Sequence, residues 1–185
     1  MILGVTGASG APIAVRALRA IHAAGVPVAL VVSDGAVLVL KEECGLAPAD
    51  LAPYAREVYS DSDLAAPIAS GSRPSRGMAI VPCSGNTLAK VSVGISDTLI
   101  TRAAQVQLKE HRSLIVVPRE TPLGAIQLRH MANLAELGVV VLVASAAYYT
   151  HPRSVDDITD YLAGKLLDHL HVPHALYRGW KAPSG

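Results

Sequence analysis

The sequence is poor in cysteine and in aromatic residues. Its 185 residues include only Cys44 and Cys83 as cysteines, a single tryptophan and no phenylalanine. Two cysteines cannot build the disulfide framework of a small secreted domain, so we expect a reducing compartment, most simply the cytoplasm. The chain also opens on apolar residues, without the basic start and cleavage site of a signal peptide, which agrees with that expectation.

The sequence has no excess of charge and no long apolar run. Its 16 basic and 15 acidic residues leave a net charge of +1, and no basic stripe carries interleaved aromatics. We therefore expect no nucleic-acid partner. The longest apolar stretch, residues 139–149, is far shorter than the roughly 20 residues that span a bilayer, so we expect no membrane segment.

Apolar residues are what the chain has in quantity. Hydrophobic residues make up 51% of it and its mean hydropathy is +0.37. Such a chain can build a sizeable core. The value is high for a soluble monomer, so we expect a well-covered parallel sheet, extensive contacts between subunits, or both.

Short runs rich in Val, Ile and Leu alternate with segments of helical spacing. The predicted strands are residues 1–6, 27–32, 77–82, 113–118 and 139–143, and the predicted helices are residues 11–24, 34–43, 84–93, 123–137 and 154–170. This alternation predicts an α/β fold with a doubly wound parallel sheet, a Rossmann or flavodoxin-like three-layer sandwich. Residues 45–76 are rich in proline and irregular, and we expect an excursion that ends in a flexible loop.

We expect residues 1–185 to form a single domain. Its tail, about residues 171–185, carries Trp180 close to Tyr177 and Arg178. An aromatic residue in such a tail rarely belongs to the core of its own subunit. We therefore expect the tail to pack on the functional site or on a neighbouring subunit.

Two loops of small and polar residues follow predicted strands. Gly7, Ala8 and Ser9 belong to the first loop, and Ser84-Gly85-Asn86-Thr87 opens the helix after the third predicted strand. Small residues let the backbone approach an anion, and the free amides of a helix start point at it. Alone, each loop is compatible with a tight turn or an N-cap. Together, on neighbouring strand ends, they predict one shared nucleotide ligand.

A group of charged residues follows. Lys109 comes seven residues after Arg102, two helical turns, so both can share one face of a helix, and Arg119 and Glu120 follow the fourth predicted strand. Cations there suit a dianionic phosphate, and Glu120 could handle a proton or orient Lys109. Solvated salt bridges are the alternative interpretation.

Tyr149 and Lys165 further along could bind the same anion, or could be a buried phenol and a solvated amine. Three histidines, His169, His171 and His174, crowd the end of the last predicted helix. They lack accompanying acidic or cysteine ligands at a recognised spacing, so we expect no metal site.

Several separated blocks resemble one family, the flavin prenyltransferases of the UbiX type. The blocks are the loop of residues 4–10, GMAIVPCSGNTLA at 77–89, RAAQVQLKEHR at 102–112 and RETPL at 119–123. RETPL after the RAA-x-V-x-LKE helix is specific, whereas the first glycine loop is not. The blocks extend over nearly the whole chain, to about Trp180.

The resemblance implies a flavodoxin-like subunit that assembles into trimers and often dodecamers, with FMN at a subunit junction. The implied FMN residues are Gly7, Ala8, Ser9, Ser33, Ser84, Gly85, Asn86, Thr87, Arg102 and Arg119. Dimethylallyl phosphate would be bound by Lys109, Arg119, Tyr149 and Lys165, and Glu120, Lys109 and Trp180 would complete the catalytic site. The family often has Arg where Lys165 stands, and lysine lacks the bidentate fork of arginine.

The chemistry implied by the resemblance joins a dimethylallyl group to N5 and C6 of reduced FMN while phosphate leaves. The product, prenylated FMN, would serve a UbiD-type decarboxylase. Fixed cations suit the leaving phosphate, and an electron-rich wall such as Trp180 suits an allylic cation.

Three alternatives remain open on the sequence. A flavin-dependent cysteine decarboxylase shares the PCSGNT block, but that group uses a histidine after the second strand, and none occurs between His22 and His111. A short-chain dehydrogenase would use Asp34 and the Tyr161/Lys165 pair, but leaves RETPL unexplained. An FMN-binding accessory subunit would share the FMN residues without catalysing the transfer.

Overall fold

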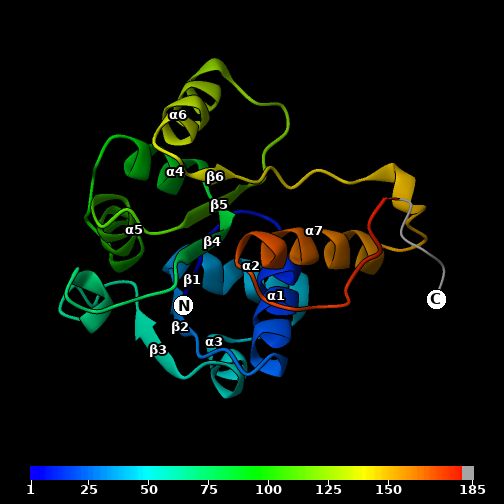
Figure 1. The fold of residues 1–185 in the computed structure, drawn as a ribbon, viewed down its shortest axis with the longest axis horizontal. Coiled ribbons are helices and arrows are strands. Elements are labelled where there is room, and N and C mark those ends of the chain that lie inside the picture. Colours follow the sequence, from blue (N-terminus) through cyan, green and yellow to red (C-terminus); the bar gives the residue numbers. More distant parts are fainter. Residues whose placement is uncertain (181–185) are drawn as a thin grey trace.

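The computed structural model describes residues 1–180 and contains one six-stranded parallel sheet (Figure 1). The strands are β1 (Ile2–Val5), β2 (Ala29–Val32), β3 (Glu57–Ser60), β4 (Met78–Cys83), β5 (Leu114–Pro118) and β6 (Val140–Val141). Their order is β3-β2-β1-β4-β5-β6, and each neighbouring pair is parallel. This is the strand order of doubly wound nucleotide-binding folds.

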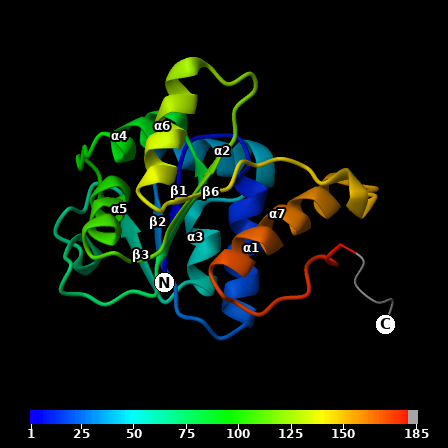
Figure 2. The same cartoon turned by 45° about the horizontal axis from the view of Figure 1, so that its top comes forward.

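Two layers of helices cover the sheet. The helices α1 (Ala11–Ala23), α2 (Asp34–Cys44) and α7 (Val155–His169) lie on one face, and α4 (Gly85–Ser92), α5 (Leu99–Lys109) and α6 (Ala125–Glu136) lie on the other (Figures 1 and 2). Each layer buries its own hydrophobic cluster against the sheet. The predicted three-layer α/β fold is confirmed. Within residues 1–180, no helix is long and apolar enough to cross a membrane.

The local sequence explains where these elements begin. The central strands β1, β2, β4 and β5 are buried along their whole length, as expected for apolar runs covered on both faces. Side-chain hydroxyls cap the starts of four helices, with Ser33, Ser84, Thr98 and Ser154 each accepting a backbone N–H from the first turn. The five strands and five helices that were predicted with bounds all occur, and each begins and ends within two residues of the prediction. No bounds were predicted for α5, although Arg102 and Lys109 were expected to lie on a helix.

The interpretation of residues 45–76 as irregular was wrong in part. The segment contains the short helix α3 (Pro48–Leu51), two 3₁₀ turns, η1 (Ala52–Tyr54) and η2 (Pro67–Ala69), and the strand β3. β3 pairs only with β2, at the edge of the sheet, and its residues alternate between half-buried and exposed. An edge strand of four residues that includes Glu57 and Ser60 has no continuous apolar run, which is the pattern that identified the other strands.

β1 and β4 are neighbours at the point where the strand order reverses, and Thr6 connects their ends. The Thr6 side chain is 2% exposed. Its hydroxyl donates to the Pro82 carbonyl at 2.7 Å and accepts the Ser84 amide at 2.8 Å. One buried hydroxyl therefore ties the loop after β1 to the start of α4.

Replacing Thr6 by valine tests this bridge, because valine keeps the shape and removes the hydroxyl. The Pro82 carbonyl and the Ser84 amide would each lose this partner, and we expect a loss of about 2 kcal/mol in the free energy of unfolding. Thr6→Ser keeps the hydroxyl and is the matched control. Urea denaturation of the three proteins measures the difference, and a valine variant as stable as the parent would contradict the assignment.

Candidate functional site

Four loops with polar side chains meet at one edge of the sheet. They are residues 6–10 after β1, Ser33 after β2, residues 84–87 after β4 and residues 119–122 after β5. The strands are parallel, so all four loops lie at the carboxyl edge, where open α/β sheets bind their ligands. Arg119 Nε donates to the Ser9 carbonyl at 3.2 Å and so links the first and last loops. The carboxyl edge thus brings together the predicted FMN residues Gly7, Ala8, Ser9, Ser33, Ser84, Gly85, Asn86, Thr87 and Arg119.

The loops after β1 and β2 touch backbone to backbone. A Cβ atom on Gly7 would lie 3.0 Å from the Cα atom of Gly35, a tighter contact than nearly all that Cβ atoms make in proteins. Glycine at position 7 therefore permits the contact, and the exposed Gly35 is a residue of the site that sequence reasoning missed.

The serine hydroxyls of two loops already act as helix caps. Ser33 Oγ accepts the Ala36 amide at 3.3 Å, and Ser84 Oγ accepts the Thr87 amide at 3.2 Å and lies 3.0 Å from Thr87 Oγ1. The N-cap interpretation of Ser84 is therefore correct. A capping hydroxyl accepts through oxygen, so the Ser33 O–H proton can still be donated to a ligand.

The start of α1 differs from the expectation of free amides. The amides of Gly10 and Ala11 both donate to Glu43 Oε2, each at 2.9 Å, and the next residue, Pro12, has no amide proton. The Ile13 amide donates to the Gly10 carbonyl at 3.0 Å. An anion in this loop must therefore use the backbone of Gly7–Ser9, the hydroxyls and the Arg119 guanidinium rather than the amides that begin α1. Glu43, at the end of α2, was not predicted from the sequence, because nothing in a helix-end glutamate marks it as the cap of another helix.

A second group of predicted residues lies around the start of α7 and the tail. The Tyr149 ring makes edge-on contacts with Trp180, centroids 5.1 Å apart, and with Tyr161, 6.4 Å apart. These rings and the Tyr177 ring wall an open hollow of about 770 Å³. Lys165 lies one helical turn beyond Tyr161 and close enough to influence the pKa of the Tyr161 phenol, which burial raises first of all. Tyr149 is thus in contact with Trp180, and Tyr161 lies between Tyr149 and Lys165. That Tyr149 and Lys165 bind one phosphate group stays a prediction.

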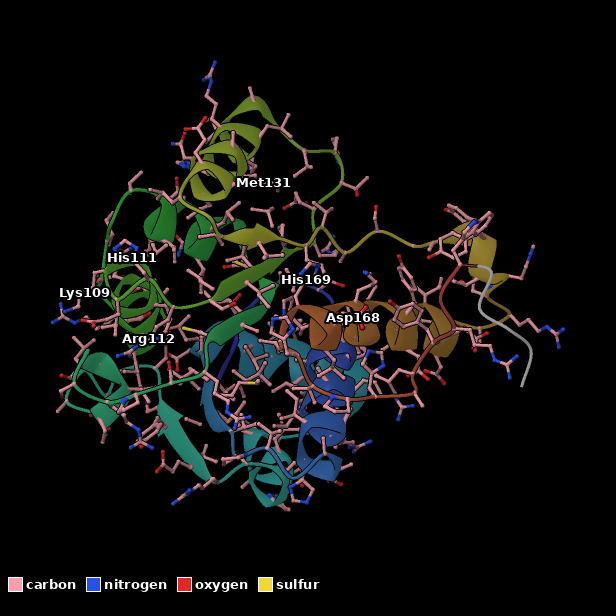
Figure 3. The ribbon with its side chains drawn as sticks, in the orientation of Figure 1. Lys109, His111, Arg112, Met131, Asp168 and His169 are labelled. Atoms are coloured by element: carbon pink, nitrogen blue, oxygen red, sulfur yellow. The ribbon has the colours of Figure 1, made fainter. Side chains whose placement is uncertain are left out.

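The structure does not bring all predicted residues together within one chain. Lys109 ends α5 at the amino edge of the sheet, opposite Arg119 and Glu120, and its ammonium lies 3.4 Å from Glu110 Oε1. Figure 3 shows Lys109 at the left edge of the molecule on α5, and Asp168 near the middle on α7. Arg102 and Lys109 are both exposed, and Arg102 Nε donates to the Ala69 carbonyl at 3.3 Å. The expected contact of Arg102 and Lys109 with the Arg119 loop stays a prediction.

Cys83 and the histidines near the end of α7 are the remaining side chains that could carry nucleophilic or metal chemistry. Burial raises the pKa of the Cys83 thiol to about 12, so the thiol beside Ser84 stays protonated at neutral pH and is a poor nucleophile. Among residues 1–180 no three His, Cys, Asp or Glu side chains converge on a point that could hold a metal ion. His174 of the histidine cluster instead bonds Asp168. The expectation that the protein uses no metal stays a prediction.

Comparison with known proteins identifies relatives along the whole fold. The flavoprotein family model matches residues 1–167. The flavin prenyltransferase UbiX of Thermoplasma acidophilum is 46% identical over 180 residues, which cover 97% of this chain and 99% of the relative. The flavin prenyltransferase UbiX of Deinococcus radiodurans is 42% identical and covers 98% of this chain and 93% of its own.

Solved structures agree with these relatives. The crystal structure of AnUbiX (PadA1) in complex with FMN and dimethylallyl pyrophosphate matches with a TM-score of 0.95 and 36% identity, covering 99% of this chain and 97% of the other. A dodecameric FMN-dependent UbiX-like decarboxylase from Escherichia coli O157:H7 also matches with a TM-score of 0.95, at 40% identity, covering 98% of each chain. The cysteine decarboxylase TvaF is only 19% identical and shares the fold. The chain therefore belongs to the flavoprotein family and, within it, to the flavin prenyltransferases of the UbiX type.

Proposed function

We propose that this protein transfers a dimethylallyl group from dimethylallyl phosphate to reduced FMN, giving prenylated FMN. The observation that carries the proposal is the meeting of four polar loops and the Arg119 guanidinium at the carboxyl edge of the sheet. A relative whose fold matches at a TM-score of 0.95 holds FMN and dimethylallyl pyrophosphate. Membership of the prenyltransferase family favours this function over the dehydrogenase alternative.

The loops at the carboxyl edge fit FMN. The close approach of Gly7 and Gly35 leaves the backbone there without side chains, as a bound phosphate or ring requires. Ser9, Ser33 and the Ser84–Thr87 turn supply hydroxyl, amide and backbone donors, and Arg119 supplies a fixed positive charge. Bound reduced FMN would supply two nucleophilic atoms. N5 would bond to the carbon that loses phosphate as N5 gives up its proton, and C6 would bond to the far carbon of the prenyl double bond as that double bond takes up a proton and C6 loses one.

The prenyl phosphate needs cations and an apolar wall. Arg119, Lys165 and Lys109 would bind the phosphate and stabilise the charge that develops as it departs, and Tyr149 would donate its phenol O–H to the same group. The Trp180 ring would face the allylic carbons, where its π-electrons stabilise positive charge. Glu120, exposed at the end of β5, would orient Lys109 or accept a proton released from the flavin.

We propose further that the site is completed by assembly, through trimers and up to a dodecamer, as in the dodecameric Escherichia coli relative. Large apolar side chains are exposed on several elements: Val93, Ile95, Ile126, Leu128, Leu137, Tyr148 and Val155. Tyr148 is 82% exposed and Val155 75%, and a neighbouring copy packed against them would bury this apolar surface. A neighbouring copy would then bring Arg102 and Lys109 to the carboxyl edge of the first.

The proposed product, prenylated FMN, would be used by another enzyme. Prenylated FMN is a modified cofactor with no further chemistry in this chain, so we propose that it passes to a decarboxylase of the UbiD type. That partner and a cytoplasmic location remain proposals.

Incubation with reduced FMN and dimethylallyl phosphate, followed by mass analysis of the flavin, tests the function. We expect a flavin heavier by one prenyl unit. An accessory subunit would return FMN unchanged, and a flavin-dependent decarboxylase would release CO₂ from a carboxylic acid without altering FMN. Parallel assays with dimethylallyl pyrophosphate identify the donor.

Ser9→Asp tests the cofactor loop. The added carboxylate would crowd and repel the flavin phosphate, and we expect FMN affinity to fall by at least about a hundredfold. Ser62→Asp adds the same charge on an exposed serine after β3, outside the four loops, and should leave the affinity unchanged. Fluorescence titration of FMN gives the dissociation constants, and unchanged affinity in Ser9→Asp would overturn the cofactor assignment.

Subunit complementation tests the shared site. Lys109→Ala and Glu120→Gln should each be nearly inactive in prenyl transfer. Co-expressed with different tags and purified as mixed assemblies, they should regain about a quarter of parental activity, because random mixing places both intact residues in a quarter of the junctions. If both residues acted within one chain, the mixture would stay as inactive as each variant.

A further inference from the structure

The tail is held against α7 by one carboxylate. Asp168, near the end of α7, accepts hydrogen bonds from the Tyr177 hydroxyl and from His174 Nε2, the latter at 3.0 Å. The same Asp168 lies 3.4 Å from the ammonium of Lys165, one turn earlier on the helix. We call these four residues (Lys165, Asp168, His174 and Tyr177) the tail anchor.

The hydrogen bonds determine the state of His174. Its Nδ1 atom accepts the Leu176 amide at 3.2 Å, so this nitrogen carries no proton. The proton must then be on Nε2, which donates it to Asp168. The Asp168 carboxylate thus fixes the tautomer that lets His174 hold the backbone of Leu176, and only 9% of the His174 side chain is exposed.

The Asp168 carboxyl group stays ionised in this setting. Burial would raise its pKa, but hydrogen bonds from Tyr177, His174 and Lys165 outweigh burial and lower the pKa below its usual value. The pKa of Tyr177 is raised, first by burial and then by Asp168, so its phenol keeps the proton it donates.

A glycine in α7 makes room for the anchor. A Cβ atom on Gly164 would lie 2.5 Å from Cδ1 of Tyr177 and 3.0 Å from Cε1 of His174. Glycine inside a helix is less favourable than alanine, so its presence here needs a reason. At this position the missing side chain allows both rings to lie directly on the helix.

The anchor reaches the proposed prenyl site through packed aromatic rings. Tyr177 contacts Tyr161 edge-on at 5.1 Å between centroids, Tyr161 contacts Tyr149, and Tyr149 contacts Trp180. Trp180 follows Tyr177 by three residues in the tail. Where Tyr177 packs against α7 therefore influences the positions of both Tyr149 and Trp180.

We propose that Asp168 is a positioning residue, which holds residues 174–177 on α7 and thereby places Tyr149 and Trp180 at the prenyl-phosphate site. The kinetic part of this inference rests on the proposed function, whereas the placement of Trp180 does not. Asp168 also faces Lys165, so removing its charge has a second, opposite effect: it leaves Lys165 free to attract phosphate.

Two variants release the anchor by independent routes. Asp168→Ala removes the acceptor of three contacts. Gly164→Ala leaves every charge in place, improves helix propensity and displaces the Tyr177 and His174 rings. Asp168→Asn keeps an oxygen acceptor and is the conservative variant, and His169→Ala, the exposed neighbour shown in Figure 3, is the control.

The single tryptophan makes the tail directly observable. In FMN-loaded protein, we expect Gly164→Ala and Asp168→Ala to increase quenching of Trp180 fluorescence by acrylamide by up to about half, because the ring, 67% exposed in the parent, loses its contact with Tyr149. Asp168→Asn should stay closer to the parent, and His169→Ala should match it. Parental quenching in both Gly164→Ala and Asp168→Ala would overturn the proposal whether or not the protein is a prenyltransferase.

Steady-state kinetics separate positioning from general damage. We expect Gly164→Ala to raise the KM for dimethylallyl phosphate about tenfold, and Asp168→Ala to raise it less, because the liberated Lys165 compensates in part. FMN affinity should remain within about twofold of the parent. Parental KM values in variants whose Trp180 has moved would show that the anchor holds the tail but does not position the site.

Discussion

The rest of the site depends on how β1 and β4 are joined where the strand order reverses. The chain leaves these neighbouring strands toward helices on opposite faces of the sheet, α1 and α4, so their loops diverge and open a crevice. The buried Thr6 hydroxyl closes the base of that crevice by satisfying the Pro82 carbonyl and the Ser84 amide. Together with the Thr6 amide, which donates to the same Pro82 carbonyl at 3.3 Å, this hydroxyl holds the Ser84–Thr87 turn beside the Gly7–Ser9 loop.

The electrostatics of the crevice differ from those of a simple phosphate loop. In such a loop the first helix amides bind the anion, but here Glu43 already occupies the amides of Gly10 and Ala11. A carboxylate beside the loop repels a phosphate, so positive charge must come from elsewhere. Arg119, which is bonded to the Ser9 carbonyl, is the cation that the structure places against the loop. Anion binding in this crevice therefore depends on side chains more than on the helix dipole.

Much of this architecture could be predicted from the sequence, because buried strands and capped helices leave local patterns. The apolar runs and the serine caps predicted the central strands and the loops at their carboxyl ends. β3 was not predicted, because an edge strand with Glu57 and Ser60 has no continuous apolar run. Three further residues, Glu43, Gly35 and Asp168, were not predicted for another reason. Each acts through a contact with a residue that is distant in the sequence or lies in another element, and a local sequence pattern does not reveal such contacts.

Lys109 shows where sequence spacing and three-dimensional position diverge. Its seven-residue distance from Arg102 predicted that both can share one face of a helix, and both are exposed on α5, but spacing cannot say which end of the sheet a helix residue reaches. The 11 residues of α5 extend about 16 Å, from the Asp61 contacts beyond β3 to the turn before β5. A lysine side chain spans only part of that distance, so no rotamer of Lys109 can meet Arg119 within one chain.

Apolar residues are exposed on α6 and near α7. Another copy of the chain could bind through these surfaces and supply its own Lys109. In the proposed assembly, the tail anchor would hold Tyr149 and Trp180 in place before the matching residues of the second copy approach them.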